Sequence, residues 1–314
     1  MAKNQKDNHS GIRSKRSKIK RPKILITGSE GFIGSAITKE LLKKKLDIYG
    51  IGKKKRNIKN YKYYDLNLYN FKKVKNFFNQ FSFDTIIHTA WVTNPNTMRN
   101  SKSNFKWLKI SKKILDLHIN NNGVNFYCVG TSDEYQRIEN KNNKCIENQS
   151  KTTNLNTYAK NKILFYKYLK KSKINFIWFR VFWLFGSKEN SKRFFPEVIN
   201  KLLNNKKFKI NNPKIGLDYS YINDAAKMMV KLIFKKNISG VYNICSGKYL
   251  NLGEIANKIS RILKKQKYLE FQNSKVNTKI YGSVKKLKKS KCYIKSNFKL
   301  KLKQLVLKSS KTTS

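Results

Sequence analysis

Three glycines spaced three residues apart, directly after a short apolar run, constrain this chain more than any other feature of its sequence. The apolar run covers residues 24–26, the glycines are Gly28, Gly31 and Gly34, and a stretch with helical character continues to about residue 45. In such a strand–turn–helix unit the first glycine permits a tight turn, the second lets backbone approach a diphosphate, and the third lets helix and strand pack closely. The N–H groups at the helix start attract phosphate. The motif therefore predicts dinucleotide binding, and the alternative is a glycine-rich turn without a ligand.

Strand and helix patterns alternate along the first 186 residues. Apolar strand candidates cover residues 24–26, 47–51, 85–89, 125–129 and 175–179. Helical stretches lie between them, at about residues 33–45, 72–81, 107–120 and 158–171. Alternation of this kind predicts an α/β fold of the Rossmann type, with a doubly wound parallel sheet.

The sequence predicts four segments. Residues 1–22 are basic and almost without apolar side chains, which is typical of a disordered tail. Residues 23–186 are expected to form the dinucleotide-binding domain. Residues 187–282 are expected to form a smaller substrate-binding lobe, interleaved with the main sheet. Its predicted helices lie at 193–205, 222–235 and 252–264, and its predicted short strands lie near 208–210, 219–221 and 241–244. Residues 283–314 are lysine-rich and predict a basic, poorly ordered tail.

The charge of the chain is unusually positive. Its 314 residues include 70 Lys and Arg against 17 Asp and Glu, which gives a formal net charge of +53. Such a charge attracts nucleic acid and other polyanions. The lysines are spread over all segments rather than gathered in one stripe, which favours a compositional origin. We therefore expect no specific nucleic-acid partner.

Neither a membrane protein nor a metal protein is expected. No apolar run approaches the ~20 residues needed to cross a bilayer, and the N-terminus has no apolar signal core. The four cysteines, Cys128, Cys145, Cys245 and Cys292, have neither metal-ligand spacing nor a disulfide pattern. The sequence predicts a cytoplasmic protein with reduced thiols and no metal.

A tyrosine and a lysine four residues apart lie in the expected helix at 158–171, so Tyr158 and Lys162 share one face. A nearby cation favours the phenolate of a tyrosine, whose unperturbed pKa is about 10. Such a pair can give and take the proton of a C–OH/C=O couple. Thr131 follows the strand candidate at 125–129, at the sheet edge where ligands bind, and can hydrogen-bond the same oxygen. Without the other motifs, Tyr158 and Lys162 are an ordinary exposed helix pair.

With the glycine loop, Thr131 and the Tyr158–Lys162 pair in this order, residues 23–264 resemble the extended short-chain dehydrogenase/reductases, also called the NAD-dependent epimerase/dehydratase family. The resemblance implies that Thr131, Tyr158 and Lys162 are catalytic and that the substrate is a nucleotide sugar. It also implies a homodimer formed through the helices at 107–120 and 158–171. The positions that it implies for cofactor binding are Gly28, Gly31, Phe32, Ile33, Gly34, Asp65, Leu66, Thr89, Ala90, Trp91, Tyr158 and Lys162.

A narrower resemblance is to the branch of 4-keto-6-deoxyhexose reductases typified by CDP-abequose synthase. Residues 90–91, 104–108 and 130–135 carry it. The dehydratase branch places Asp-Glu directly after its threonine, whereas Ser132 intervenes here and puts Asp133 and Glu134 one step later. The resemblance therefore implies a reductase whose product feeds a surface polysaccharide, with Glu134 placed to contact the substrate.

Two positions depart from the family pattern. The second strand ends in Gly52, followed by four cations at 53–56, where an NAD enzyme places an acid on the ribose hydroxyls. These cations, of which Lys53 is the first, suit a 2′-phosphate and predict a preference for NADP over NAD. The alternative is that they only reflect the many basic residues of the chain. Leu217 stands where the family commonly has an arginine that holds the substrate diphosphate. Lys214 is the nearby cation that could replace it.

Three hypotheses follow. The first is an NADP-dependent reductase of a nucleotide-linked 4-keto-6-deoxy sugar. The second is an epimerase on the same scaffold, which uses the same three residues and returns its bound cofactor. The third is a non-enzymatic polyanion-binding protein on a dinucleotide fold, motivated by the charge and opposed by the intact set of Thr131, Tyr158 and Lys162.

Overall fold

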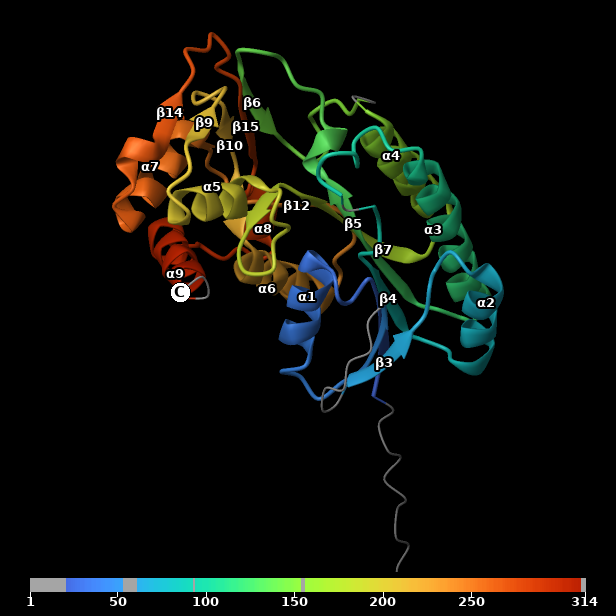
Figure 1. Ribbon diagram of the computed structural model, residues 1–314. Helices are drawn as coiled ribbons and strands as arrows, with labels where there is room; N and C mark the ends of the chain where they lie inside the picture. Colours follow the sequence, from blue (N-terminus) through green and yellow to red (C-terminus); the bar gives the residue numbers. More distant parts are fainter. Residues whose placement is uncertain (1–20, 53–60, 93, 154–155, 312–314) are drawn as a thin grey trace, which may run out of the picture.

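A sheet of seven parallel strands forms the centre of the molecule (Figure 1). The computed structural model describes residues 21–52, 61–92, 94–153 and 156–311. The strands are β1 (Lys23–Thr27), β2 (Asp47–Gly52), β3 (Tyr61–Asp65), β4 (Thr85–His88), β5 (Asn125–Thr131), β7 (Asn175–Val181) and β12 (Gly240–Ile244). Their order in space is β12-β7-β5-β4-β1-β2-β3, and every neighbouring pair is parallel. The predicted doubly wound parallel sheet is confirmed.

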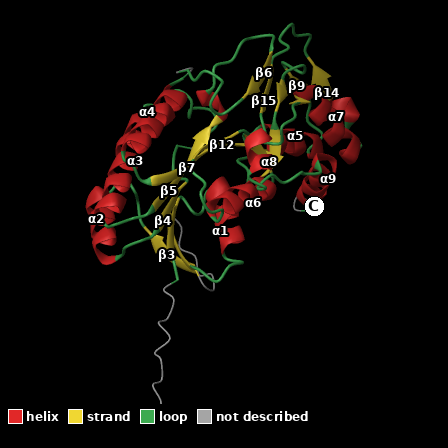
Figure 2. Cartoon of the chain, turned by 180° about the vertical axis from the view of Figure 1, so that it is seen from behind, coloured by secondary structure: helices red, strands yellow, loops and turns green. Residues whose placement is uncertain are grey.

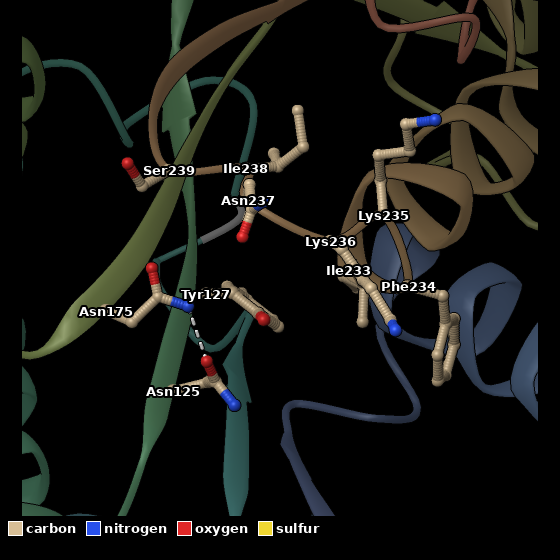
Figure 3. A pocket seen from close by; sticks show the side chains of 10 residues that line it. All are labelled: Asn125, Tyr127, Asn175, Ile233, Phe234, Lys235, Lys236, Asn237, Ile238 and Ser239. Carbon is tan, nitrogen blue, oxygen red and sulfur yellow. Dashed lines mark hydrogen bonds between the residues drawn. The ribbon is translucent and has the colours of Figure 1, made fainter.

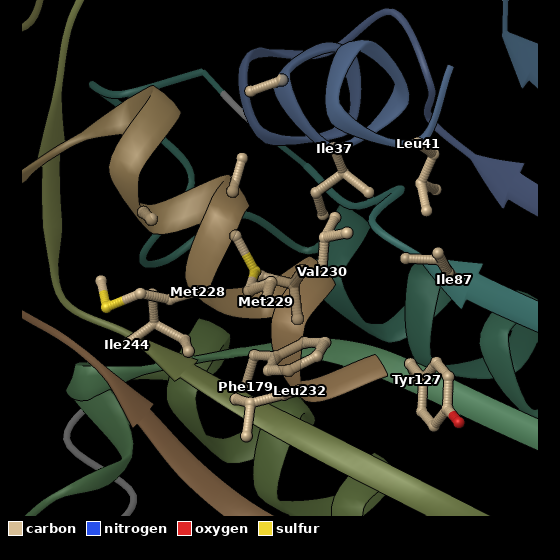
Figure 4. Packing of buried hydrophobic residues seen from close by; sticks show 14 of the residues in the cluster. Ile37, Leu41, Ile87, Tyr127, Phe179, Met228, Met229, Val230, Leu232 and Ile244 are labelled. Carbon is tan, nitrogen blue, oxygen red and sulfur yellow. The ribbon is translucent and has the colours of Figure 1, made fainter. Parts of the chain in front are cut away.

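Helices cover both faces of this sheet, because successive side chains of a strand point to opposite sides. In β1, Ile24 and Ile26 face one layer and Leu25 faces the other. The first layer holds α1 (Phe32–Leu41), α6 (Ile222–Ile233) and α8 (Lys285–Lys289). Figure 4 shows apolar side chains of α1 and α6 meeting above the strands. The second layer holds α2 (Phe71–Gln80), α3 (Ser103–Asn120) and α4 (Thr157–Lys171).

A smaller lobe lies beside the main sheet (Figure 2). Its helices α5 (Phe194–Leu203), α7 (Leu252–Leu263) and α9 (Phe298–Ser310) share one apolar core. Four of its short strands form one sheet, in the order β13 (Leu250–Asn251), β10 (Gly216–Leu217), β15 (Lys279–Gly282) and β6 (Asn142–Cys145). The other four form two separate pairs. These pairs are β11 (Tyr219–Tyr221) with β8 (Trp183–Phe185), and β14 (Leu269–Phe271) with β9 (Phe208–Ile210). Single 3-10 turns cover Ser132–Glu134 and Gln266–Tyr268.

The structure differs from the prediction at the C-terminal end. The sequence predicts a poorly ordered tail from residue 283, and the structure instead places α8 and α9 there. In α9, Leu302, Leu305 and Val306 have helical spacing and are buried in the core of the lobe, which fixes this segment. The predicted basic tail at 1–22 lies almost wholly outside the described residues.

Parts of the range predicted for the lobe belong to the main sheet. β12 is the strand at one end of the sheet, and α6 packs against α1 in the first layer. Within the described ranges, no helix is both long enough and apolar enough to cross a bilayer.

Candidate active site

The glycine loop between β1 and α1 is shaped to hold a diphosphate. Gly28 has a φ of +68°, and a Cβ there would lie 2.9 Å from the backbone of Ala90. A Cβ on Gly34 would lie 2.2 Å from the Gly28 carbonyl oxygen, whereas at the exposed Gly31 the closest described atom would be the same oxygen, at 3.2 Å. Gly31 caps α1 without a side-chain hydrogen bond, and the first turn holds no acidic residue. The N–H groups at this helix start are therefore suited to a phosphate, and the loop fits a dinucleotide.

The ends of β2 and β3 lie next to this loop. The Leu66 N–H donates to the Gly52 carbonyl oxygen at 3.0 Å, and Asp65 is exposed at the end of β3. The side chain of Glu30 lies against Gly52, since a Cβ at position 52 would come within 2.6 Å of Glu30 Cγ. A carboxylate therefore lies beside the end of β2, where the sequence has no acid of its own. Lys53, on which the NADP prediction rests, lies outside the described residues.

The residues that follow β4 are hydrogen-bonded to the glycine loop and to α3. Thr89 donates its hydroxyl to the carbonyl oxygens of Thr27, at 2.8 Å, and of Gly28, at 3.2 Å. The Trp91 indole N–H donates to Asn104 Oδ1 at 2.8 Å, and its ring is buried. These side chains therefore have partners within the protein.

Phe32 and Ile33, which open α1, are partly buried and pack against the core of the first layer. Ala90 is buried, and its backbone closes on Gly28. The three residues thus fix the distance between α1, β1 and the loop after β4. The structure places all of them around the glycine loop, and their binding of a cofactor stays a prediction.

The structure brings Thr131, Tyr158 and Lys162 together at the carboxyl edge of the sheet. Thr131 ends β5, and its hydroxyl lies near enough to the Tyr158 hydroxyl to oppose the rise in the pKa of Tyr158. Thr131 Oγ1 also accepts the Asp133 N–H at 3.1 Å, so its own proton is left for Tyr158 or for a ligand. Lys162 lies one turn further along α4, with Nζ 5.9 Å from the centre of the Tyr158 ring.

The protonation state of Tyr158 differs from the prediction. Burial, followed by the charges of Asp133 and Glu134, raises the pKa of Tyr158 above its ordinary value, while the hydrogen bond from Thr131 and the charge of Arg193 oppose the shift. Lys162 is expected to lower the pKa of Tyr158, but this effect does not prevail. The Lys162 ammonium instead donates to the Val129 carbonyl oxygen at 2.7 Å and lies 3.8 Å from the centre of the Trp91 ring. Tyr158 is therefore a neutral phenol at pH 7.

Replacing Lys162 with Met is expected to remove a pH dependence of stability. Burial lowers the pKa of Lys162 from 10.5 to about 8. Between these two values the unfolded chain binds more protons than the folded chain, so the contribution of Lys162 to the free energy of unfolding rises with pH and is least favourable below pH 8. Relative to Lys162→Met, the wild type should therefore gain stability from about pH 8 to about pH 10. Urea unfolding of both proteins measures the difference, and a constant difference would contradict a titrating ammonium here.

Asp133 and Glu134 are both neutralised by arginines. Asp133 accepts hydrogen bonds from Arg99, at 3.2 Å, and from Arg137. Burial on its own raises the pKa of Asp133, but the charges and hydrogen bonds of the two arginines outweigh it and lower this pKa. Asp133 therefore stays ionised at pH 7.

Glu134 points into the protein. Its Oε1 accepts from the Thr131 N–H at 2.8 Å and from Trp178 Nε1 at 3.0 Å, and its Oε2 accepts from Arg180 Nε at 2.7 Å. The side chain is fully buried. Both carboxylate oxygens of Glu134 are thus used beneath Thr131, and its predicted contact with a substrate has no support in this arrangement. An arginine within the otherwise apolar β7 was the sequence signal for a buried acidic partner.

The substrate-side positions named from the sequence lie in the smaller lobe. Lys214 is exposed on the turn before β10, and Leu217 is partly buried in β10. The next residue, Asp218, is buried and accepts four hydrogen bonds, from Ser246 N and Oγ and from the N–H groups of Gly247 and Gly282. Asp218 thus ties strands of the lobe to the end of β12.

The buried His88 has a structural place. Its ring nitrogens lie 2.8 Å from Thr27 Oγ1 and 2.8 Å from Ser111 Oγ, and burial, aided by the charge of Lys162, lowers its pKa to about 3. The four cysteines are buried and free. Across the described ranges, no three His, Cys, Asp or Glu side chains gather closely enough to hold a metal ion.

Two pockets lie at the opposite, amino edge of the sheet. One, of about 570 Å³, is lined by Asn125 and Asn175, the first residues of β5 and β7, by Tyr127 and by residues 233–239 (Figure 3). The other, of about 500 Å³, lies between residues 42–48 and the start of β3. Neither is lined by Thr131, Tyr158 or Lys162, so we place the chemistry at the carboxyl edge.

Comparison with known proteins gives one family. Residues 24–245 match the model of the NAD dependent epimerase/dehydratase family. The dTDP-D-glucose 4,6-dehydratase of Dictyostelium discoideum is 30% identical over 269 residues, which are 76% of this chain and 62% of that protein. The chain thus spans less than two thirds of the length of this relative.

Solved structures share the fold. A UDP-glucose 4-epimerase of Thermotoga maritima has a TM-score of 0.82 at 16% identity, covering 93% of this chain and 100% of that chain. A UDP-glucuronic acid 4-epimerase of Bacillus cereus, solved with UDP-glucuronic acid and NAD, has a TM-score of 0.79 at 19% identity. The match covers 93% of this chain and 100% of that chain. At these identities the likeness is one of fold.

Proposed function

The chain belongs to the NAD dependent epimerase/dehydratase family, and on that basis we propose that it is a nicotinamide-dependent oxidoreductase that reduces the C4 ketone of a nucleotide-linked 4-keto-6-deoxyhexose. The observation that carries the proposal is that Thr131, Tyr158 and Lys162 come together at the sheet edge that also holds the glycine loop. The resemblance of residues 90–91, 104–108 and 130–135 to the reductase branch supports it. The product alcohol would serve surface polysaccharide synthesis.

The side chains divide the work of ketone reduction. The glycine loop would hold a nicotinamide dinucleotide, which would supply the hydride for C4 when bound. Tyr158, a neutral phenol, gives its proton to the ketone oxygen, so that C4 and its oxygen together gain one hydride and one proton. The Thr131 hydroxyl orients that oxygen, because its proton is free to donate. Lys162, held by Val129 and Trp91, places a positive charge beside the phenolate that remains.

The carboxylates argue against dehydration. Elimination of water from a sugar needs a general acid and a general base that reach it, with pKa values near the working pH. Asp133 is held ionised by Arg99 and Arg137, and Glu134 is fully buried beneath Thr131. The first is a poor proton donor and the second does not reach a ligand. This supports reduction over the activity named for the Dictyostelium relative.

Epimerisation is the second candidate, and the fold favours it. The two solved structures compared above are 4-epimerases, and an epimerase would use the same three residues. Oxidation is then followed by reduction from the other face of the sugar, with no net use of cofactor.

The test uses a panel of 4-keto-6-deoxyhexoses linked to UDP, dTDP, CDP and GDP, together with UDP-glucose. Cofactor oxidation is followed by absorbance, and the products are identified by NMR. We expect one equivalent of reduced cofactor to be consumed for each sugar alcohol formed. A C4 epimer formed without net cofactor use would assign the epimerase. Turnover of neither class would overturn both proposals.

Cofactor preference depends on two opposite charges at the end of β2. The NADP preference stays a prediction that rests on the cations at 53–56, which lie outside the described residues. The carboxylate of Glu30 lies against Gly52 and would repel a 2′-phosphate there. We therefore expect Glu30→Gln to raise the affinity for NADPH relative to NADH by about tenfold, whichever cofactor the wild type prefers, since ~1.4 kcal/mol corresponds to that ratio.

Dissociation constants for both cofactors, measured by quenching of protein fluorescence, give this ratio. Glu40→Gln is a matched control on α1, because Glu40 pairs with Lys43 at the other end of the helix. An unchanged ratio in Glu30→Gln would remove Glu30 from the cofactor site.

The homodimer stays a prediction as well. The two helices named for it are α3 and α4, which pack side by side in the second layer. Phe105 on α3 and Leu164 on α4 are exposed, and they offer apolar surface for a second copy.

A further inference from the structure

A carboxyl group in the loop from β8 to α5 is buried without a hydrogen bond at one oxygen. Glu189 Oε2 is shielded from solvent and has no partner among the described residues. Burial raises the pKa of Glu189 to about 8, with the charge of Arg193 opposing the shift. A buried polar atom without a partner costs stability, and buried polar atoms left unpaired often mark ligand sites. Glu189 is thus prepared to hydrogen-bond a hydroxyl group that the free protein does not supply.

Arg193, four residues further on, has donors to spare. It is the residue before α5, and its Nη2 donates to the thioether sulfur of Met98 at 3.3 Å. A thioether is a weak acceptor, and a guanidinium has five N–H donors. Within the described ranges, no carboxylate lies within ion-pair distance of Arg193. The Arg193 guanidinium can therefore offer several N–H donors to an anionic ligand.

Arg193 lies near Tyr158, and Glu189 lies near Arg193. Met98, which Arg193 contacts, precedes Arg99, and the Arg99 carbonyl oxygen accepts the Tyr158 N–H at 2.9 Å. Burial raises the pKa of both Tyr158 and Glu189, and the charge of Arg193 opposes the shift of each. The loop from β8 to α5 therefore brings a positive charge close to Tyr158.

We infer that Arg193 binds the diphosphate of a nucleotide sugar and that Glu189 hydrogen-bonds a hydroxyl of its sugar. This inference rests on the proposed function. The planar fork of arginine matches phosphate oxygens, which a lysine does not. Leu217 carries no charge, and Lys214 is exposed on a turn, so we assign to Arg193 the role of the arginine that the family commonly has at position 217.

The two roles can be separated with two kinds of ligand. Binding of UDP, dTDP, CDP and GDP, and of the corresponding nucleotide sugars, is measured by calorimetry on the full chain. Arg193→Met should weaken the nucleoside diphosphate and the nucleotide sugar alike, by about 10- to 100-fold. Arg193→Lys, which keeps the charge but loses the fork, should lie between the wild type and Arg193→Met.

Glu189→Gln should leave the bare nucleoside diphosphate unaffected and weaken only the nucleotide sugar, by about 5- to 10-fold. Arg261→Met, on the exposed face of α7 in the same lobe, is the matched control and should bind both ligands like the wild type. Unchanged dinucleotide affinity in each variant verifies the fold.

The outcomes distinguish this inference from the function on which it rests. If the wild type binds nucleotide sugars and Arg193→Met binds them equally well, the assignment of Arg193 is overturned while the proposed function stands. Equal binding of the nucleotide sugar by Glu189→Gln and the wild type overturns the assignment of Glu189. If the wild type binds none of the nucleotide sugars, the proposed function falls, and this inference falls with it.

Discussion

Replacing Tyr158 with Phe should reduce turnover by about 10²- to 10⁴-fold and leave the fold and the dinucleotide affinity unchanged. The change removes one hydroxyl and keeps the buried ring in place. That hydroxyl is the proton donor of the proposed reaction, and the Thr131 hydroxyl lies beside it. Steady-state turnover of the substrate found in the nucleotide-sugar panel measures the loss, and cofactor titration measures binding.

Tyr168→Phe is the matched control for this prediction. Tyr168 lies on the same helix, α4, and its hydroxyl donates to Asp116 Oδ1 at 2.8 Å, so the same atom is removed away from the site. Its turnover should equal that of the wild type. If Tyr158→Phe and Tyr168→Phe were both fully active, Tyr158 would have no chemical role.

Glu134→Ala is expected to lower the free energy of unfolding by about 3–5 kcal/mol. The substitution leaves the Arg180 guanidinium, which is 3% exposed, without its carboxylate. It also leaves Trp178 Nε1 and the Thr131 N–H without their acceptor. Urea unfolding measures the stability. Turnover should fall too, because Thr131 is held by the same carboxylate.

An exposed ion pair of the same length is the control. Lys207 Nζ and Glu270 Oε1 are 2.7 Å apart, as are Arg180 Nε and Glu134 Oε2, but the Lys207 and Glu270 side chains are 76% and 43% exposed. Glu270→Ala should therefore change stability little, since solvent screens this pair.

A double-mutant cycle tests the pairing of Glu134 with Arg180 itself. The double variant Glu134→Ala/Arg180→Ala should lose less stability than the sum of the two single variants. Equal costs for Glu134→Ala and Glu270→Ala, or strict additivity in the cycle, would contradict a strongly coupled buried pair.

The main sheet and the common face of Tyr158 and Lys162 were predictable because local patterns encode them. A strand buried on both faces is a continuous apolar run, and β1, β4 and β5 are of this kind. The four-residue spacing of Tyr158 and Lys162 fixes their common helix face without any tertiary information. β3 was missed because its five residues, three of them tyrosines, are partly exposed at the end of the sheet.

The direction of Glu134 could not be predicted in the same way. Its place beneath Thr131 depends on Arg180, 46 residues later in the chain, and on the neighbouring pairing of β5 with β7. The same holds for Arg193, whose contact with Met98 spans 95 residues. The helix α9 was missed because lysines separate its buried positions and mask their period. In each case the deciding partner lies outside any local window.

Transfer of deuterium to the sugar tests the central claim most directly. The protein is incubated with a reduced cofactor carrying deuterium at C4 of the nicotinamide and with the panel of nucleotide-linked 4-keto-6-deoxyhexoses, and the products are examined by NMR. We predict an alcohol with deuterium at C4 of the sugar from the wild type, and at most a trace from Tyr158→Phe under conditions in which both proteins bind the cofactor. Bound cofactor without transfer to any member of the panel, or equal transfer by both proteins, would contradict the account.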